Sequence, residues 1–228
     1  MSDKKTVVLD LDQTIISAEA DEDFDFKKYK KKAKKFKYHD MDSYYIVFER
    51  PGLQKFLNYL FDNFRVVVWT AASKDYALFI VKNILIAGKK NRRVDWIFFS
   101  YHCDISKKLK GGSKDLRMLW DEYHLDGVEA DKTLIVDDYD EVHDTQPGNC
   151  VIAFPFEFTE DESEKDDYLK RLQVELEKFK DSSSSEPARA INDALQGSPE
   201  QESQDSQDSD DSGNSTDDES VQESSSKK

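Results

Sequence analysis

Cysteine, histidine and glycine are scarce in this chain of 228 residues, which has two Cys, four His and eight Gly. Cys103 and Cys150 lie far apart and form no CxxC pair, and the histidines show no ligand spacing. Neither a disulfide framework nor a zinc site is therefore predicted. We expect both cysteines to be free, buried thiols in a reducing compartment.

Long apolar runs are also missing. No run approaches the roughly 18 apolar residues of a membrane span, and the first residues, MSDKKTVVLDLD, contain no apolar signal region. We therefore expect a soluble intracellular protein, nuclear or cytoplasmic, that has no membrane partner.

Aliphatic and aromatic side chains are rare near the C-terminus. Residues 1–180 carry 30 Lys and Arg with 35 Asp and Glu, whereas residues 181–228 carry 3 with 13 and include 14 serines. Such a segment buries too little apolar area to offset the entropy lost on ordering. The composition predicts one domain over residues 1–180 and a disordered, acidic tail over residues 181–228.

The apolar runs that are present are short, rich in β-branched residues and not alternating, which is typical of strands covered on both faces of a parallel sheet. Strands are predicted at residues 6–11, 65–70, 94–101, 133–136 and 150–154. Helical spacing of apolar residues predicts helices at 53–64, 73–88, 116–123 and 168–179. This alternation of strands and helices indicates an α/β fold with a doubly wound, mostly parallel sheet and helices on both faces.

One segment interrupts that alternation. Residues 20–49 begin acidic, continue with eight lysines in residues 27–37, and end in YYIVFE, so we predict an insertion made of a linker and a small β-hairpin. The lysine run is open to three interpretations: attraction of acidic, phosphorylated peptides, a nuclear import signal, or a solvated loop. Residues 107–113 are predicted to be a second Lys-rich loop.

Polar residues that follow the predicted strands are the candidates for chemistry, because ligands of doubly wound sheets bind beyond the carboxyl ends of the strands. Asp10 and Asp12 follow the first strand and point the same way, with their carboxylates roughly 6–7 Å apart. One carboxylate can attack phosphorus while the other handles a proton, provided that a metal ion and a lysine screen the repulsion between anions. Alone, such an acid pair fits a turn cap equally well.

Four further residues complete the pattern. Thr70 follows the second strand just before a helix, where a hydroxyl and backbone N–H groups can hold phosphate. Lys114 follows Gly111-Gly112-Ser113, and Asp137 with Asp138 follows the fourth strand, where they offer hard oxygen ligands for Mg²⁺ or cap a helix. Each has an ordinary structural explanation by itself, but the ordered set on consecutive βα units indicates phosphoryl transfer.

The segments DLDQT, RPGLQKFLNYL, VVVWTA, GGSKDL and IVDD resemble the haloacid dehalogenase (HAD) superfamily. Within it, they are similar to the NLI-interacting-factor-like branch, which contains the small C-terminal-domain phosphatases of RNA polymerase II, over residues 5–180. The resemblance implies a magnesium-dependent phosphoserine or phosphothreonine protein phosphatase with an aspartyl-phosphate intermediate. The C-terminal repeat of RNA polymerase II is one candidate substrate, among other nuclear or cytosolic phosphoproteins.

The resemblance also implies a role for each candidate residue. Asp10 would be the nucleophile and Asp12 the general acid and base, while Thr70 and Lys114 would hold the phosphoryl oxygens. Mg²⁺ would bind Asp10, the backbone carbonyl of Asp12 and Asp138, with Asp137 supporting the metal through water.

Two positions depart from the pattern of the branch. Gln13 stands where Glu is usual, and Asp138 stands where Asn is usual, which adds a negative charge beside the metal. Neither change removes a catalytic carboxylate.

Two other classes of function stay open on the sequence. One is a phosphoprotein-binding adaptor that has the same fold but little turnover. The other is a phosphatase with the same chemistry whose substrate is a small phosphomonoester or a nucleic-acid 3′-phosphate. The acidic tail argues against a direct nucleic-acid partner, because it repels phosphodiesters.

Overall fold

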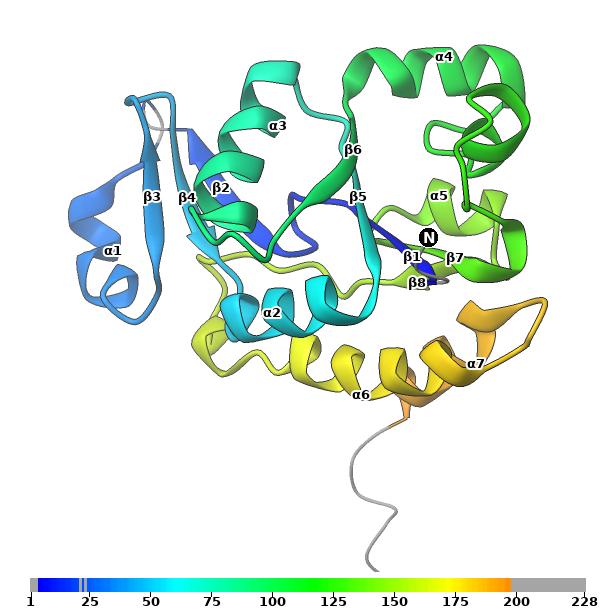
Figure 1. Ribbon diagram of the computed structural model, residues 1–228. Helices are drawn as coiled ribbons and strands as arrows, with labels where there is room; N and C mark the ends of the chain where they lie inside the picture. Colours follow the sequence, from blue (N-terminus) through cyan, green and yellow to red (C-terminus); the bar gives the residue numbers. More distant parts are fainter. Residues whose placement is uncertain (1–3, 21, 23, 198–228) are drawn as a thin grey trace, which may run out of the picture. The chain divides into compact units, whose positions relative to one another are not determined.

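The computed structural model describes residues 4–20, 22 and 24–197, and at its centre lies a five-stranded sheet (Figure 1). The strand order is β6-β5-β1-β7-β8, and every neighbouring pair is parallel. The strands are β1 (Thr6–Leu9), β5 (Arg65–Trp69), β6 (Val94–Phe98), β7 (Thr133–Asp137) and β8 (Cys150–Ile152). This confirms the predicted α/β class with a doubly wound, parallel sheet.

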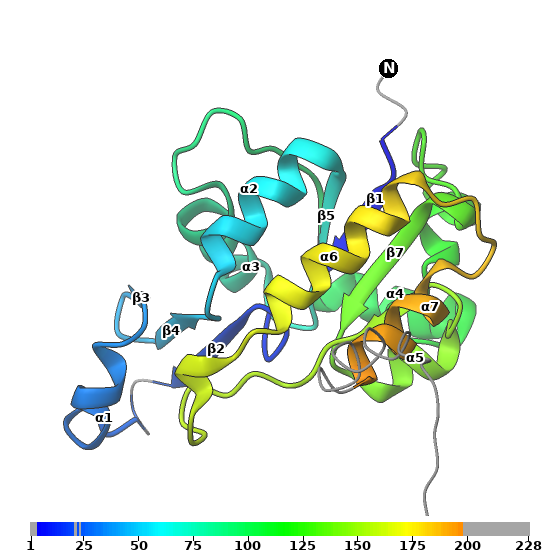
Figure 2. The ribbon, with the colours of Figure 1, turned by 90° about the horizontal axis from the view of Figure 1, so that it is seen from below.

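Helices cover both faces of this sheet because successive strand residues point in opposite directions. Val7 and Leu9 of β1 join an apolar cluster with the buried faces of α2 (Leu53–Asn63), α3 (Lys74–Ile80) and α6 (Tyr168–Asp181). Val8 joins the opposite cluster, to which α4 (Ser100–Lys110) and α5 (Asp140–Thr145) contribute. Figure 2 shows α6 lying across one side of the sheet.

The helix predicted over residues 53–64 is α2, which begins at Leu53. Its N-cap, Gly52, has a φ of 80°, the left-handed conformation that glycine adopts without strain. Its buried residues follow the 3.6-residue period: Leu53, Phe56, Leu57, Leu60 and Phe61. The described part of the chain also contains four short helical segments. They are the π-helical segments Val81–Ile86 and Met118–Glu122 and the 3₁₀ segments Ala130–Lys132 and Ser163–Lys165.

The insertion contains more structure than the predicted linker and hairpin. It forms a three-stranded antiparallel sheet of order β2-β4-β3, built from β2 (Ile16–Ala20), β3 (Tyr38–Met41) and β4 (Tyr45–Glu49). The lysine run forms the helix α1 (Phe26–Ala33), which corrects the prediction of a linker. Asp25 caps this helix by accepting hydrogen bonds from the backbone N–H groups of its first turn.

A second correction concerns the predicted Lys-rich loop at residues 107–113. Its first four residues belong to α4, which extends to Lys110, and the turn begins only at Gly111, whose φ is 91°. Cys103 and Ser106 form the buried side of this helix, so its apolar face was too narrow to recognise in the sequence.

The C-terminal part of the described chain is a third correction. Residues 187–196 were predicted to be disordered, but they form the helix α7 (Pro187–Gln196), which buries Ala188, Ile191 and Leu195 in the main apolar cluster. Asn192 of α7 bonds to the edge of β8: its amide oxygen accepts from Ile152 N at 2.9 Å and its amide nitrogen donates to Cys150 O at 2.9 Å. Residues 198–228, the rest of the predicted tail, lie outside the described residues.

Both cysteines are free and buried, as predicted. In the described part of the chain, every helix is too short or too polar to cross a membrane.

Candidate active site

The candidate residues meet at one edge of the sheet because β5, β1 and β7 are neighbouring parallel strands. Asp10 follows β1, Thr70 follows β5, and Asp137 is the last residue of β7. Their carboxyl ends all point to the same edge, where a cavity of about 510 Å³ opens. This cavity is lined by all six residues predicted from the sequence: Asp10, Asp12, Thr70, Lys114, Asp137 and Asp138.

Three carboxylates form the base of the cavity. Oxygen atoms of Asp10, Asp137 and Asp138 all lie within 4.8 Å of one another. Asp10 is 5% exposed and Asp137 is 1% exposed, so bulk water screens their repulsion poorly. Such a group of anionic oxygens is stable only when a cation is close.

Lys114 supplies one positive charge to this group. Its Nζ lies 2.6 Å from Asp10 Oδ1 and 2.7 Å from Asp137 Oδ2. Burial favours the neutral amine, but the two carboxylates outweigh it and raise the pKa of Lys114 above its usual value. The sequence indicated Lys114 as a candidate without showing that it would bridge two strand ends.

The pKa values of the acids reflect the same crowding. Burial, followed by the charge of Asp10, raises the pKa of Asp137 to about 7 and also raises the pKa of Asp138. One lysine against three close carboxylates leaves an excess of negative charge. Carboxylate oxygens are the ligands that hard divalent cations prefer, so the donor set fits Mg²⁺.

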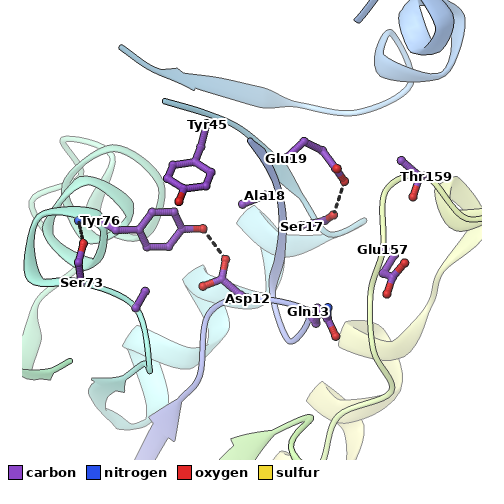
Figure 3. A pocket seen from close by; sticks show the side chains of 11 residues that line it. Asp12, Gln13, Ser17, Ala18, Glu19, Tyr45, Ser73, Tyr76, Glu157 and Thr159 are labelled. Carbon is purple, nitrogen blue, oxygen red and sulfur yellow. Dashed lines mark hydrogen bonds between the residues drawn. The ribbon is translucent and has the colours of Figure 1, made fainter. Parts of the chain in front are cut away.

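Asp12 lies at the boundary between this cavity and a neighbouring groove. It accepts a hydrogen bond from the hydroxyl of Tyr76 in α3 (Figure 3). Burial is the main cause that raises the pKa of Asp12 to about 6. A carboxyl with that pKa is present in both protonation states near neutral pH, as an acid and base catalyst requires.

Hydrogen bonds of Thr14 fix the loop that follows β1 and carries Asp12. Its Oγ1 donates to Asp138 Oδ1 at 3.0 Å and lies 3.4 Å from Asp10 Oδ2. Its backbone carbonyl accepts from Arg50 Nη1 at 2.8 Å. The guanidinium of Arg50 also makes a two-pronged pair with Asp166, at 2.8 and 2.7 Å. The loop that carries Asp12 is thus held by a buried arginine.

Thr70 is buried, and its hydroxyl accepts a hydrogen bond from Ala72 N at 3.1 Å. This contact shapes the turn between β5 and α3, whose residues Thr70, Ala71 and Ala72 line the cavity. The structure therefore brings Thr70 to the wall of the cavity.

A groove adjoins the cavity and has a volume of about 560 Å³. We call it the side groove and define it by its lining residues: Asp12, Gln13, Ser17, Ala18, Glu19, Tyr45, Ala72, Ser73, Tyr76, Glu157 and Thr159. In Figure 3, Tyr45 and Tyr76 lie on one side of it, and Glu19, Glu157 and Thr159 lie on the other. The contact of Tyr76 with Asp12 joins this groove to the cavity.

Sequence reasoning missed this role of Tyr76. It assigned the residue to the apolar face of a helix, where its ring does pack against the core, and no local pattern shows that the hydroxyl reaches Asp12. Glu141 was missed as well. It accepts a hydrogen bond from Ser113 N at 3.1 Å and so fixes the turn before Lys114.

Comparisons with known proteins identify the family of the chain. The family model described as NLI interacting factor-like phosphatase matches residues 5–186. The CTD phosphatase-like protein 355R of invertebrate iridescent virus 6 is 42% identical over 173 residues, which cover 74% of this chain and 95% of that protein. Its counterpart in invertebrate iridescent virus 3 is 42% identical over 186 residues, covering 78% of this chain and 97% of that protein.

Among solved structures, similarity is found to the fission yeast RNA polymerase II CTD phosphatase Fcp1 bound to beryllium fluoride. The TM-score is 0.49 and the identity 18%, and the match covers 84% of this chain and 62% of the other.

Proposed function

Since the chain belongs to the NLI interacting factor-like phosphatase family, and so to the HAD-type phosphatases, we propose that it is a magnesium-dependent phosphoserine or phosphothreonine protein phosphatase. The observation that carries the proposal is the cluster of Asp10, Lys114, Asp137 and Asp138 beside Asp12, which lies in a separate environment. Two carboxylates with different surroundings are what nucleophilic attack and proton transfer require.

Asp10 is the nucleophile of this proposal. Its carboxylate oxygen attacks phosphorus, the bond between phosphorus and the serine or threonine oxygen breaks, and that oxygen keeps the electron pair. Lys114, 2.6 Å from Asp10 in the free protein, screens the approach of the anionic phosphate. The product of this step is an aspartyl phosphate on Asp10.

Asp12 handles the proton in both steps. In its protonated form it gives a proton to the leaving oxygen, and as a carboxylate it then takes a proton from the water that attacks the aspartyl phosphate. That attack breaks the bond between Asp10 and phosphorus and releases inorganic phosphate. The raised pKa of Asp12 and its hydrogen bond from Tyr76 support this role.

Thr70 and Lys114 bind the phosphoryl oxygens in this scheme. The residues that would hold Mg²⁺ are Asp10, Asp138 and the backbone carbonyl of Asp12, with Asp137 in support. When bound, the ion supplies positive charge that offsets the charge of the phosphoryl group. Thr14 orients the carboxylate of Asp138.

A protein substrate is favoured by the open surroundings of the site. The side groove continues from Asp12 along the surface and offers room for residues that flank a phosphorylated side chain. The iridovirus relatives carry the description CTD phosphatase-like, so the C-terminal repeat of RNA polymerase II is the first phosphopeptide to test. An intracellular location, nuclear or cytoplasmic, would agree with such substrates.

The test is turnover of p-nitrophenyl phosphate and of a phosphopeptide panel, with Mg²⁺ or EDTA, by the wild type and by Asp10→Asn. We expect the variant to lose activity by at least about 10³-fold while its circular-dichroism spectrum shows that it is still folded. Asp104→Asn is the matched control, because Asp104 lines the same cavity, is exposed and has no role in the mechanism. Equal activity of Asp10→Asn and wild type would disprove the mechanism.

A second candidate function is that of a phosphoprotein-binding adaptor with little turnover. Asp138 places an additional carboxylate beside the cation site, and its repulsion of the phosphoryl group at Asp10 would slow the reaction. Saturable phosphopeptide binding without turnover would favour the adaptor. Turnover of small phosphomonoesters or oligonucleotide 3′-phosphates alone would favour a phosphomonoesterase of another substrate class.

A further inference from the structure

One side of α1 is strongly basic although the chain has a net charge of -15. Lys27, Lys30, Lys31 and Lys34 are exposed and have no ion-pair partner among the residues that the structure describes, and we call them the lysine face. The other four lysines of the run contact other groups of the protein. Lys28 lies 4.8 Å from the centre of the Tyr29 ring, Lys32 donates to the carbonyls of Thr159 and Glu160, Lys35 pairs with Glu164, and Lys37 pairs with Glu49.

The four lysines share one side of the helix because residues three, four and seven positions apart lie on the same face. Like charges at these spacings repel and destabilise an isolated helix by a few tenths of a kcal/mol per pair. The helix macrodipole favours lysines in the last turn, which accounts for Lys30 and Lys31 but not for Lys27 in the first turn. An anionic partner would relieve the repulsion of the whole face.

This face is held rigidly. Ala33 is buried, and Phe26 and Tyr29 pack against a cluster of aromatic rings that includes Phe48 and Phe158. Figure 1 shows α1 beside β3, at the outer side of the three-stranded sheet. A helix fixed in this way presents its charges without losing much conformational entropy when a partner binds.

The lysine face also lies next to the route into the candidate active site. Lys32 of the same helix contacts the segment 159–160, and Thr159 lines the side groove together with Asp12. The groove itself contains the carboxylates of Glu19 and Glu157, and repulsion from Glu157 adds to the burial that raises the pKa of Glu19. Acidic residues of a partner are therefore disfavoured in the groove and favoured beyond it, at α1.

We propose that the lysine face is a docking site for an acidic or multiply phosphorylated stretch of the polypeptide substrate, separated by a few residues from the phosphorylated residue bound at Asp10. The link to turnover rests on the proposed phosphatase function, whereas the binding itself does not. A polypeptide fits better than a nucleic acid, because the carboxylates of the groove and the net charge repel a continuous phosphodiester chain. The helix of eight residues is only about 12 Å long and matches a short acidic stretch.

The test uses full-length protein and two fluorescent phosphopeptides that differ only in a run of four Glu or four Gln beyond the phosphoserine. Binding is measured by fluorescence anisotropy in the Asp10→Asn background, so that turnover is not needed. The triple variant Lys27→Glu, Lys31→Glu and Lys34→Glu is compared with the charge-matched control Lys90→Glu, Lys108→Glu and Lys170→Glu. The control lysines are exposed on other parts of the surface.

We expect the lysine-face variant to bind the Glu-containing peptide at least about tenfold more weakly, with less salt dependence, and the control to stay within about twofold. Binding of the Gln peptide by the lysine-face variant should change by less than twofold. Turnover of p-nitrophenyl phosphate, measured with the same three substitutions and an intact Asp10, should also change by less than twofold. Equal loss in both variants, or tighter binding of a 20-nucleotide single strand than of the Glu-containing peptide, would overturn the proposal. If the wild type did not turn over p-nitrophenyl phosphate, the phosphatase function would be refuted instead.

Discussion

Replacement of Arg50 by methionine should destabilise the protein strongly although Arg50 makes no contact with the predicted reaction centre. The residue is 1% exposed and donates three hydrogen bonds of 2.7–2.8 Å, two to Asp166 and one to the carbonyl of Thr14. Its guanidinium also lies 4.3 Å from the centre of the Tyr168 ring. Methionine fills most of the volume but satisfies none of these acceptors.

The expected loss in the free energy of unfolding is about 3 kcal/mol. Removing one partner of a buried ion pair costs about 3–5 kcal/mol, and we take the lower end because the side chain of Asp166 is 20% exposed. Out of a total stability of about 5–15 kcal/mol, such a loss is easily measured by urea unfolding at pH 7.5. The double variant with Asp166→Asn should cost less than the sum of the two single changes.

Arg189→Met provides the matched control for this measurement. Arg189 also pairs with an acid, Glu186, but both side chains are exposed, by 61% and 52%. An exposed pair contributes at most about 1 kcal/mol. If Arg50→Met lost no more than Arg189→Met, the reasoning from burial and charge pairing would be refuted.

Two further predictions concern stability. Because the pKa of Asp137 is raised to about 7 in the folded protein, the native state binds more protons than the unfolded state between about pH 4 and 7. In EDTA, the melting temperature should therefore fall as the pH rises through this window, and the melting temperature of Asp137→Asn should fall by less. Addition of Mg²⁺ should raise the melting temperature of the wild type more at pH 7.5 than at pH 5. A melting temperature that rises equally in both proteins would contradict this. Asn192→Ala removes both bonds to the backbone of β8 and should lower the free energy of unfolding by about 1–3 kcal/mol in urea unfolding, whereas Asn83→Ala, which removes one bond within a helical segment, should lower it by less.

The strands of the sheet could be predicted because strands covered on both faces appear as unbroken apolar runs, such as TVVL and RVVVW. The helix α1 could not, because its stability depends on packing against Phe48 and Phe158, which are distant in the sequence. The helix α7 was missed for a similar reason. Its three buried apolar residues are few in number, and they are stabilised by a surface that only the folded domain provides.

The sequence predicted those residues of the site whose positions depend only on the order of the strands. Asp10 and Asp137 end neighbouring strands, and neighbouring parallel strands bring their ends together. The contacts of Lys114 and Tyr76 depended instead on side-chain reach across loops, which sequence spacing does not encode. The short distances and the raised pKa values therefore emerged only from the structure.

The contact of Asn192 with β8 has a consequence for how the sheet ends. A carboxamide carries the same donor and acceptor as a peptide group, and Asn192 offers both to the outer side of the strand. Unpaired edges invite strands from other molecules and so promote aggregation. One amide side chain thus protects this border of the sheet against intermolecular pairing. A chain that ends before residue 187 should aggregate more readily through the uncovered edge of β8.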